Sequence, residues 1–209
     1  MRGLRLLWLA LLAGATAMAP ARQPIKGAMT KPDNRPGLGC GADNAAAVPA
    51  LQRRPRLAGF YDHYLAIDGT RVLEWKLDAP PRVVFDGARH VSVAGRIGYA
   101  IDGQDRLLRW TLGAAAAKPE PELDGVALAS AGDSSVLAIR CDGSLWQRRA
   151  GGATPWQRIA PAAMHTWVGD SSDHYIDAGG RLFATGKAHR GQYGNGQLTD
   201  ADGWVAVAE

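Results

Sequence analysis

Apolar and polar residues alternate in short segments from about residue 57 to the end of the chain. Segments such as HYLAID at 63–68 and RVLEWK at 71–76 have the two-residue period of a half-buried β-strand. An Asp-Gly pair separates these two segments, and such a pair between alternating segments is a strong signal for a β-hairpin. No apolar stretch with the 3.6-residue period of a helix follows the N-terminal apolar run. The pattern therefore predicts an all-β protein built from hairpins.

The strand pattern recurs with a period of about 37 residues. One set of markers is Gly59, Gly95, Gly132 and Gly169. A second set is Val72, Leu107, Leu145 and Leu182. A repeat of this length with four short strands favours a propeller blade over a helical array or a leucine-rich horseshoe. The predicted blades cover residues 57–93, 94–131, 132–168 and 168–209.

A half repeat precedes the four full blades. Residues 35–52 are similar to the end of the last blade, so the repeat region is predicted to span residues 35–209. Four blades and a half are few for a closed ring, which propellers reach with four to eight blades. Two forms stay open at this point, a small closed ring and a partial propeller. A partial propeller has exposed strand edges and would need a partner or a second copy of itself, which makes a homodimer possible.

The N-terminus has the layout of a secretory signal peptide. Arg2 and Arg5 precede an apolar run at residues 6–12, and small residues follow it. The run is too short to cross a bilayer and no second run follows, so we expect no membrane span. We expect a signal peptide at 1–21 and a flexible Pro-rich linker at 22–34, with a buried N-terminal helix as the alternative. The protein is therefore expected to be secreted or periplasmic.

Charge argues against nucleic acid as a partner. The whole chain has a formal net charge of +4, but its excess of positive charge lies in the first 56 positions. Residues 57–209 hold 15 basic against 18 acidic residues, a net charge of −3. A nucleic-acid binder should carry a basic stripe on its folded part. We therefore expect no nucleic-acid partner.

The two cysteines allow a single pairing. Cys40 and Cys141 would meet an oxidising compartment after export, where disulfides form and persist. A disulfide between them would tie the N-terminal arm to the third repeat. Two free, buried thiols are the alternative. The five histidines form no zinc-ligand spacing, so we expect no metal and no cofactor.

Recurring polar residues favour a scaffold over an active site. The tetrapeptide GDSS occurs at 132–135 and again at 169–172, one repeat apart. A catalytic serine has no reason to recur at the structural period, whereas Asp and Ser in tight turns do. By the same reasoning His63 and His174 are interpreted as structural, and the recurring tryptophans as packing between blades, with a sugar-binding slot as the minor alternative. We therefore expect no enzyme.

The last repeat resembles a known family. His174, the Gly179-Gly180 turn, Thr185-Gly186 and the loop GQYGNG at 191–196 follow one another as in repeats of the regulator of chromosome condensation family. The middle repeats keep the hairpin but lack the Gln-Gly loop. The resemblance implies a β-propeller, of seven blades in that family, and its secreted bacterial relatives include a β-lactamase-inhibitory protein. The segments SLWQRR and PWQRIA are also similar to tectonin-type lectin repeats.

These observations predict an exported, non-enzymatic binding module. Strands alternate in direction, so the loops after the first and third strands of each blade are expected to share one face. We expect a protein partner, held on that face by Tyr61, Asp62, Asp133, Asp170, Arg190, Gln192 and Tyr193. The alternative is a lectin-like, carbohydrate-binding propeller of the tectonin type.

Overall fold

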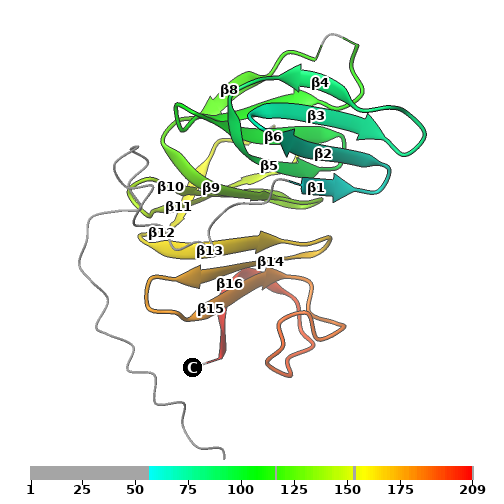
Figure 1. Ribbon diagram of the computed structural model, residues 1–209. Coiled ribbons are helices and arrows are strands. Elements are labelled where there is room, and N and C mark those ends of the chain that lie inside the picture. Colours follow the sequence, from blue (N-terminus) through cyan, green and yellow to red (C-terminus); the bar gives the residue numbers. More distant parts are fainter. Residues whose placement is uncertain (1–56, 116, 153, 209) are drawn as a thin grey trace, which may run out of the picture. The chain divides into compact units, whose positions relative to one another are not determined.

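The computed structural model describes residues 57–115, 117–152 and 154–208. Within these ranges the chain forms four antiparallel sheets of four strands, each a meander in chain order, and no helix (Figure 1). The all-β prediction is therefore confirmed. The predicted signal peptide, linker and half repeat, together with Cys40, lie outside the described residues.

Each sheet corresponds to one predicted repeat. Sheet 1 consists of β1 (Leu57–Phe60), β2 (His63–Asp68), β3 (Arg71–Lys76) and β4 (Arg82–Phe85). Sheet 2 consists of β5 (Ala88–Ala94), β6 (Ile97–Asp102), β7 (Leu107–Thr111) and β8 (Glu120–Leu123). Sheet 3 consists of β9 (Val126–Ala131), β10 (Ser135–Arg140), β11 (Leu145–Arg149) and β12 (Gln157–Ala160). Sheet 4 consists of β13 (Ala163–Val168), β14 (Ser172–Asp177), β15 (Leu182–Gly186) and β16 (Ala201–Ala208).

The central hairpin has the same register in all four sheets. The corresponding pairs are Ile67 with Val72, Ile101 with Leu107, Ile139 with Leu145, and Ile176 with Leu182, and in sheet 1 one further pair, Asp68 with Arg71, closes the hairpin. The second set of sequence markers therefore occupies one structural position. Aspartates fix this turn in sheets 2, 3 and 4 by accepting backbone N–H bonds of 2.8–2.9 Å, as Asp residues do in tight turns.

The glycine markers do not occupy one structural position, so that part of the repeat alignment is wrong. Gly132 and Gly169 are equivalent, because each donates its N–H across the first turn of its sheet, to Ser135 and Ser172. Gly95 instead lies in the turn itself, and Gly59 lies within β1, paired with Tyr64.

Different local constraints select these glycines. A side chain at Gly132 would meet the carbonyl oxygen of Gly169 at 2.6 Å, so close packing of sheets 3 and 4 requires glycine there. Gly95 has a φ of 55°, a left-handed conformation, and Tyr61 holds the equivalent turn position of sheet 1 with a φ of 52°. Glycine is therefore required at Gly132 by close packing between sheets, and is favoured at Gly95 by the left-handed backbone conformation.

Consecutive sheets pack face to back. We call the leading face of a sheet the one that carries Ile67, Ile101, Ile139 or Ile176, and the opposite face the trailing face. Because side chains alternate along a strand, each leading face presents one apolar set to the trailing face of the next sheet. Leu65, Ile67 and Val72 of sheet 1 pack in this way on Val91, Val93, Ala100 and Trp110 of sheet 2. Equivalent clusters join sheet 2 to sheet 3 and sheet 3 to sheet 4.

Polar clamps cross each of these three interfaces. Glu74 is buried and accepts hydrogen bonds from Trp110 Nε1 (3.0 Å) and Gly113 N (2.6 Å) of sheet 2. The ring of His90 in sheet 2 bonds the Ala129 carbonyl of sheet 3 through Nε2 at 2.6 Å. Asp173 of sheet 4 accepts hydrogen bonds from Ser134, Ser135 and Gln147 of sheet 3. Each clamp satisfies polar groups that would be costly to bury alone.

The ring does not close within the described residues. The first strands β1, β5, β9 and β13 lie side by side in succession, but sheets 1 and 4 share no comparable contact in the described part of the chain. Of the two predicted forms, this part of the chain has that of a partial propeller (Figure 1).

Burial of His90 makes stability depend on pH. Burial lowers the pKa of His90 to about 4 from its ordinary value of 6.5, with the adjacent Arg89 acting in the same direction. The unfolded chain therefore binds a proton between pH 6.5 and 4 that the folded chain does not bind. The contribution of neutral His90 to the unfolding free energy is fully present above pH 6.5 and is lost as the pH falls toward 4.

We therefore expect His90→Gln to remove part of the acid sensitivity. Between pH 7 and pH 5 the wild type should lose about 2 kcal/mol more unfolding free energy than this variant, measured by urea denaturation at both values. His165→Gln, at an exposed position, is the control and should behave as wild type. Identical pH dependence of wild type and His90→Gln would contradict the assignment.

Candidate partner-binding face

Loops after the first and third strands of each sheet share one face, as predicted. In every sheet the residue directly after the third strand donates its N–H to the backbone carbonyl of the second residue of the first turn. These bonds join Leu77 to Asp62, Leu112 to Arg96, Ala150 to Ser134 and Lys187 to Ser171, at 2.8–3.1 Å. One repeated bond therefore positions all eight loops, and we call their surface the loop face.

Sheet 1 contributes an exposed aromatic and aliphatic pair to the loop face. The side chains of Tyr61 and Leu77 are 80% and 75% exposed, and the Leu77–Asp62 backbone bond holds their loops together. The ring of Phe60 contacts the ring of Tyr61 edge-on, with centroids 4.5 Å apart. The sequence predicted Tyr61 but missed Leu77, because only the fold shows that the loop after β3 turns its leucine outward.

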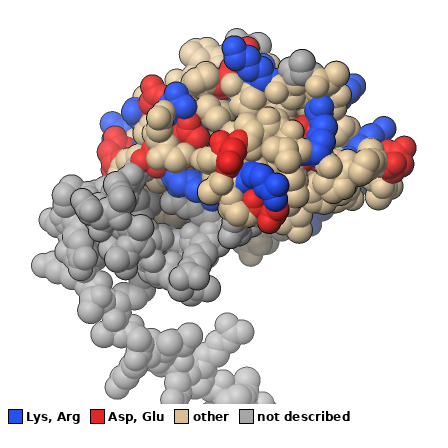
Figure 2. All heavy atoms as spheres, turned by 45° about the horizontal axis from the view of Figure 1, so that its top comes forward, with Lys and Arg blue, Asp and Glu red and all other residues tan. Residues whose placement is uncertain are grey.

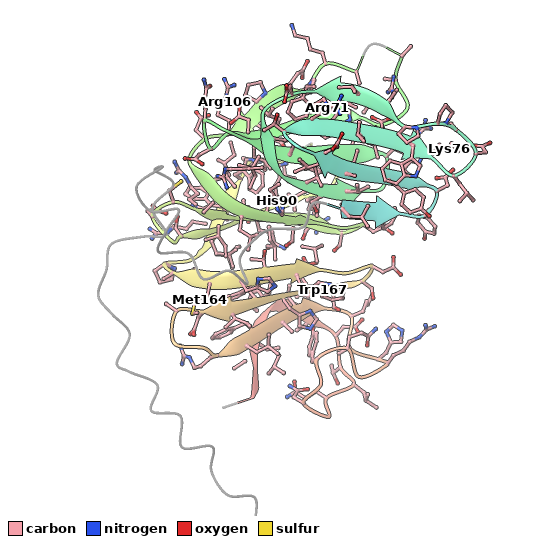
Figure 3. The ribbon with its side chains drawn as sticks, viewed as in Figure 1. Arg71, Lys76, His90, Arg106, Met164 and Trp167 are labelled. Carbon is pink, nitrogen blue, oxygen red and sulfur yellow. The ribbon has the colours of Figure 1, made fainter. Side chains whose placement is uncertain are left out.

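Charges next to this pair are fixed by ion pairs. Asp62 lies 2.8 Å from His63 Nδ1 and 3.4 Å from Lys76 Nζ, and Figure 3 shows Lys76 at the outer end of β3. Desolvation acts to raise the pKa of Asp62, but the hydrogen bonds from His63 and Lys76 outweigh it, so that pKa is lowered. Asp62 is therefore ionised at neutral pH and is held next to the exposed Tyr61 by these two contacts.

Asp133 and Asp170 come together from sheets 3 and 4. Both are exposed and each is the first residue of the equivalent turn. Desolvation and the neighbouring Asp170 carboxyl raise the pKa of Asp133. The Asp170 carboxyl acts on Asp133 through a hydrogen bond between the two side chains and through its like charge, and a cation between them would favour the ionised form of both. The sequence named both residues, and the structure brings them into one acidic pair.

The two serines of the first GDSS segment serve the scaffold. Ser134 and Ser135 donate to Asp173 at 3.1 and 2.5 Å, and burial raises the pKa of that carboxyl although the hydrogen bonds oppose this. His174 directs Nε2 to the Gln192 carbonyl at 3.2 Å. In the described part of the chain no serine hydroxyl is hydrogen-bonded to a histidine ring. The Ser, His and Asp residues of these segments therefore form no catalytic triad here.

The prediction that Tyr193 projects toward a partner is wrong. Its side chain is 2% exposed and packs with Ala184, Ala188 and Val207. Its hydroxyl donates to the Gly186 carbonyl at 2.6 Å and accepts from Ala201 N at 3.1 Å. The tyrosine thus anchors the long loop at 187–200 to its own sheet, because an apolar ring with a polar tip satisfies both needs there.

The other two predicted residues of this loop differ in exposure. Arg190 is exposed, and its backbone N–H donates to the Gln192 side chain at 2.8 Å. Gln192 is half-buried and its carbonyl receives the His174 bond. Lys187 pairs with Asp200 at 2.7 Å. Arg190 is therefore presented to solvent, whereas Gln192 mainly shapes the loop.

The surface charge is mixed. Figure 2 shows acidic and basic side chains interspersed over the face in view, with no continuous basic stripe. Among the described residues no group of three or more His, Cys, Asp or Glu side chains is placed to hold a metal ion. No helix in residues 57–208 is long and apolar enough to span a membrane.

Solved structures share this fold. No protein-family model and no curated protein matches the chain. Yeast RCC1 (Prp20), solved bound to Kap60, is 15% identical with a TM-score of 0.61, and the match covers 73% of this chain and 48% of that one. Prp20p from Saccharomyces cerevisiae, described with its binding to Gsp1p and histones, is 16% identical with a TM-score of 0.60, covering 73% and 50%. Human WBSCR16 is 17% identical with a TM-score of 0.59, covering 74% and 53%.

These likenesses support an RCC-type β-propeller at the level of the fold. The chain spans about half the length of these solved structures. The similarity to tectonin repeats and to secreted bacterial relatives stays a prediction, as does the Cys40–Cys141 disulfide.

Removing the Tyr193 hydroxyl should weaken the fold. Tyr193→Phe leaves Gly186 O and Ala201 N without their buried partner, and we expect it to lower the unfolding free energy by about 1–3 kcal/mol. Tyr61→Phe, at an exposed position, is the matched control and should stay within about 0.5 kcal/mol of wild type. Chemical denaturation measures both, and equal stability of the two variants would contradict the anchoring role.

Neutralising Asp170 should lower the pKa of Asp133. Asp170→Asn removes the like charge that helps to raise that pKa. Carboxyl ¹³C titration by NMR should show the Asp133 resonance titrating at a lower pH than in wild type. Asp62→Asn, in another sheet, should leave it unchanged. An unaltered Asp133 titration in Asp170→Asn would show that the two carboxyl groups do not interact.

Proposed function

We propose that this chain is an exported, non-enzymatic module that binds a protein partner through its loop face. The observation that carries the proposal is the exposure of Tyr61 and Leu77 on two loops that the Leu77–Asp62 backbone bond joins. Exposed aromatic side chains make good anchors for a protein partner, because they bring a large contact area and have few rotatable bonds to order on binding. The secretory layout of residues 1–21 supports export.

Charge on the loop face supports a partner with a basic group. Asp133 and Asp170 repel each other across neighbouring turns, and a lysine or arginine of the partner would relieve this repulsion. Asp62 adds a further carboxylate beside Tyr61. We propose that the partner inserts an apolar protrusion at Tyr61 and Leu77 and places a basic side chain against the acidic pair.

Fold likeness supports the general class only. Prp20 was solved with Kap60 and studied for binding to Gsp1p and histones, so a propeller of this type serves as a protein-binding surface there. Those partners are not carried over, because the sequence identity of 15–16% shows a shared fold alone. The carbohydrate-binding alternative has no observation on the loop face that favours it and becomes an outcome of the test.

The test is capture of proteins by the full, exported chain from an extracellular or periplasmic extract. We expect a saturable protein partner whose affinity falls about 10-fold or more in Tyr61→Ala/Leu77→Ala, and falls in Asp133→Asn/Asp170→Asn with reduced dependence on salt. Arg106→Ala, at a partly exposed position in the turn between β6 and β7 and away from the loop face, is the control and should bind as wild type. Capture that is unchanged in both loop variants would contradict the proposal. Failure to capture any protein together with selective glycan binding would replace it by the lectin alternative.

A further inference from the structure

In the part of the chain that the structure describes, large exposed apolar side chains lie on the first and last sheets. Among the described residues, the large hydrophobic side chains that are exposed are Leu57, Tyr61, Leu77 and Val83 of sheet 1 and Met164, Trp167 and Leu198 of sheet 4. Sheets 2 and 3, which have a neighbour on each side, expose none. Tyr61, Leu77 and Leu198 lie on loops. The other four lie on strands, two on sheet 1 and two on sheet 4, and apolar side chains left exposed on a sheet face mark an interaction surface.

The leading face of sheet 4 repeats the faces that mate inside the chain. Ile176 and Leu182 occupy the positions that Ile139 and Leu145 occupy in sheet 3, where both are fully buried against sheet 4. In sheet 4 they line an open, almost wholly apolar pocket of about 380 Å³ with Trp167, His174 and His165. Trp167 is 56% exposed, so its predicted role in packing between blades is not fulfilled by the described residues. Figure 3 shows Trp167 and Met164 along β13.

The trailing face of sheet 1 repeats the complementary faces. Trp75 occupies the β3 position that corresponds to Trp110 in β7. Trp110 is buried at the interface of sheets 1 and 2, where Phe85 packs against it. Trp75 instead stacks on Tyr64 of its own sheet, with ring centroids 5.4 Å apart. Leu57 and Val83, 63% and 53% exposed, extend this apolar face on the two edge strands.

We propose that a second copy of this chain covers these faces, with its sheet 1 docked through the trailing face on the leading face of sheet 4. The repeat argues for this occupant, because the two open faces hold the same positions that mate three times within each chain. Such a head-to-tail contact is heterologous and closes a ring if the rotation permits. The described sheets of two copies number eight, within the four to eight blades of propellers. The matched neighbours contain about twice the aligned length of chain.

The loop at 187–200 limits where the copy docks. Tyr193 and Ala188 of this loop already pack on Ala184 and Val207 of their own sheet, so the outer part of the leading face is covered. The inner part, with Trp167, His174 and Ile176, is open. Docking is therefore expected at the inner strands β13 and β14, the counterparts of the strands that make the interfaces inside the chain. This surface lies apart from the loop face and does not rest on the proposed function.

The test is the molar mass of the purified full chain, by size-exclusion chromatography with light scattering over a concentration series. We expect two copies for wild type, and one copy for both Trp167→Glu, which blocks the leading face, and Leu57→Glu/Val83→Glu, which blocks the trailing face. Leu77→Glu, exposed on the loop face, is the control and should remain a dimer. Circular dichroism melts establish that all variants fold.

Mixing the two face variants gives the sharper result. In a one-to-one mixture one interface has both native faces, so association should return as a mixed dimer, at least about 10-fold weaker than that of wild type because the second interface is blocked on both sides. A wild type that stays monomeric at about 100 μM would overturn the proposal, since another segment or protein would then cover these faces. A trailing-face variant that remains dimeric, a mixture that does not associate, or growth beyond two copies would also overturn it.

Discussion

The structure depends on the packing of one sheet's leading face against the trailing face of the next. A four-stranded meander of this size has two apolar faces, and neither can be buried by the sheet alone. Three interfaces solve this within the described residues, each with an apolar cluster and a polar clamp at Glu74, His90 or Asp173. The apolar clusters supply most of the stabilisation, at about 1.5–3 kcal/mol for each fully buried Leu, Ile or Val. The clamps fix how the sheets are placed, because their buried polar groups are satisfied in one arrangement.

The residues that build the scaffold differ from those that form the candidate site. The residues that recur with the repeat serve the sheets and turns, as Ser135 and Asp173 show by bonding to each other across an interface. The loops are free to differ, since one backbone bond per sheet fixes their positions. Exposed Tyr61 and Leu77 in sheet 1 are such a difference. The first residue of the first turn is Tyr61 in sheet 1 and Gly95 in sheet 2 but aspartate in sheets 3 and 4, so the acidic pair distinguishes the last two sheets from the first two. Function is expected where the repeats depart from one another, because shared residues are already accounted for by folding.

Much of the fold could be predicted from the sequence, because strand alternation and the central hairpin are local properties. One set of sequence markers occupies a single structural position in the four sheets, namely Val72, Leu107, Leu145 and Leu182. The glycine markers did not, since glycine is selected by close packing at Gly132 and by backbone conformation at Gly95. The exposure of individual site residues depends on tertiary contacts, so it could not be predicted from local sequence. Tyr193 is buried by its own sheet, while Trp167 is exposed because no described sheet follows sheet 4.

A double-mutant cycle across the first interface tests the central claim that paired positions hold neighbouring sheets together. Glu74→Ala and Trp110→Phe each remove one partner of the 3.0 Å bond between sheets 1 and 2. The account predicts a coupling energy of about 0.5–3 kcal/mol between them in equilibrium unfolding. Glu74→Ala combined with Ser135→Ala, at a different interface, should be additive within about 0.5 kcal/mol. Additivity of Glu74→Ala with Trp110→Phe would contradict the account.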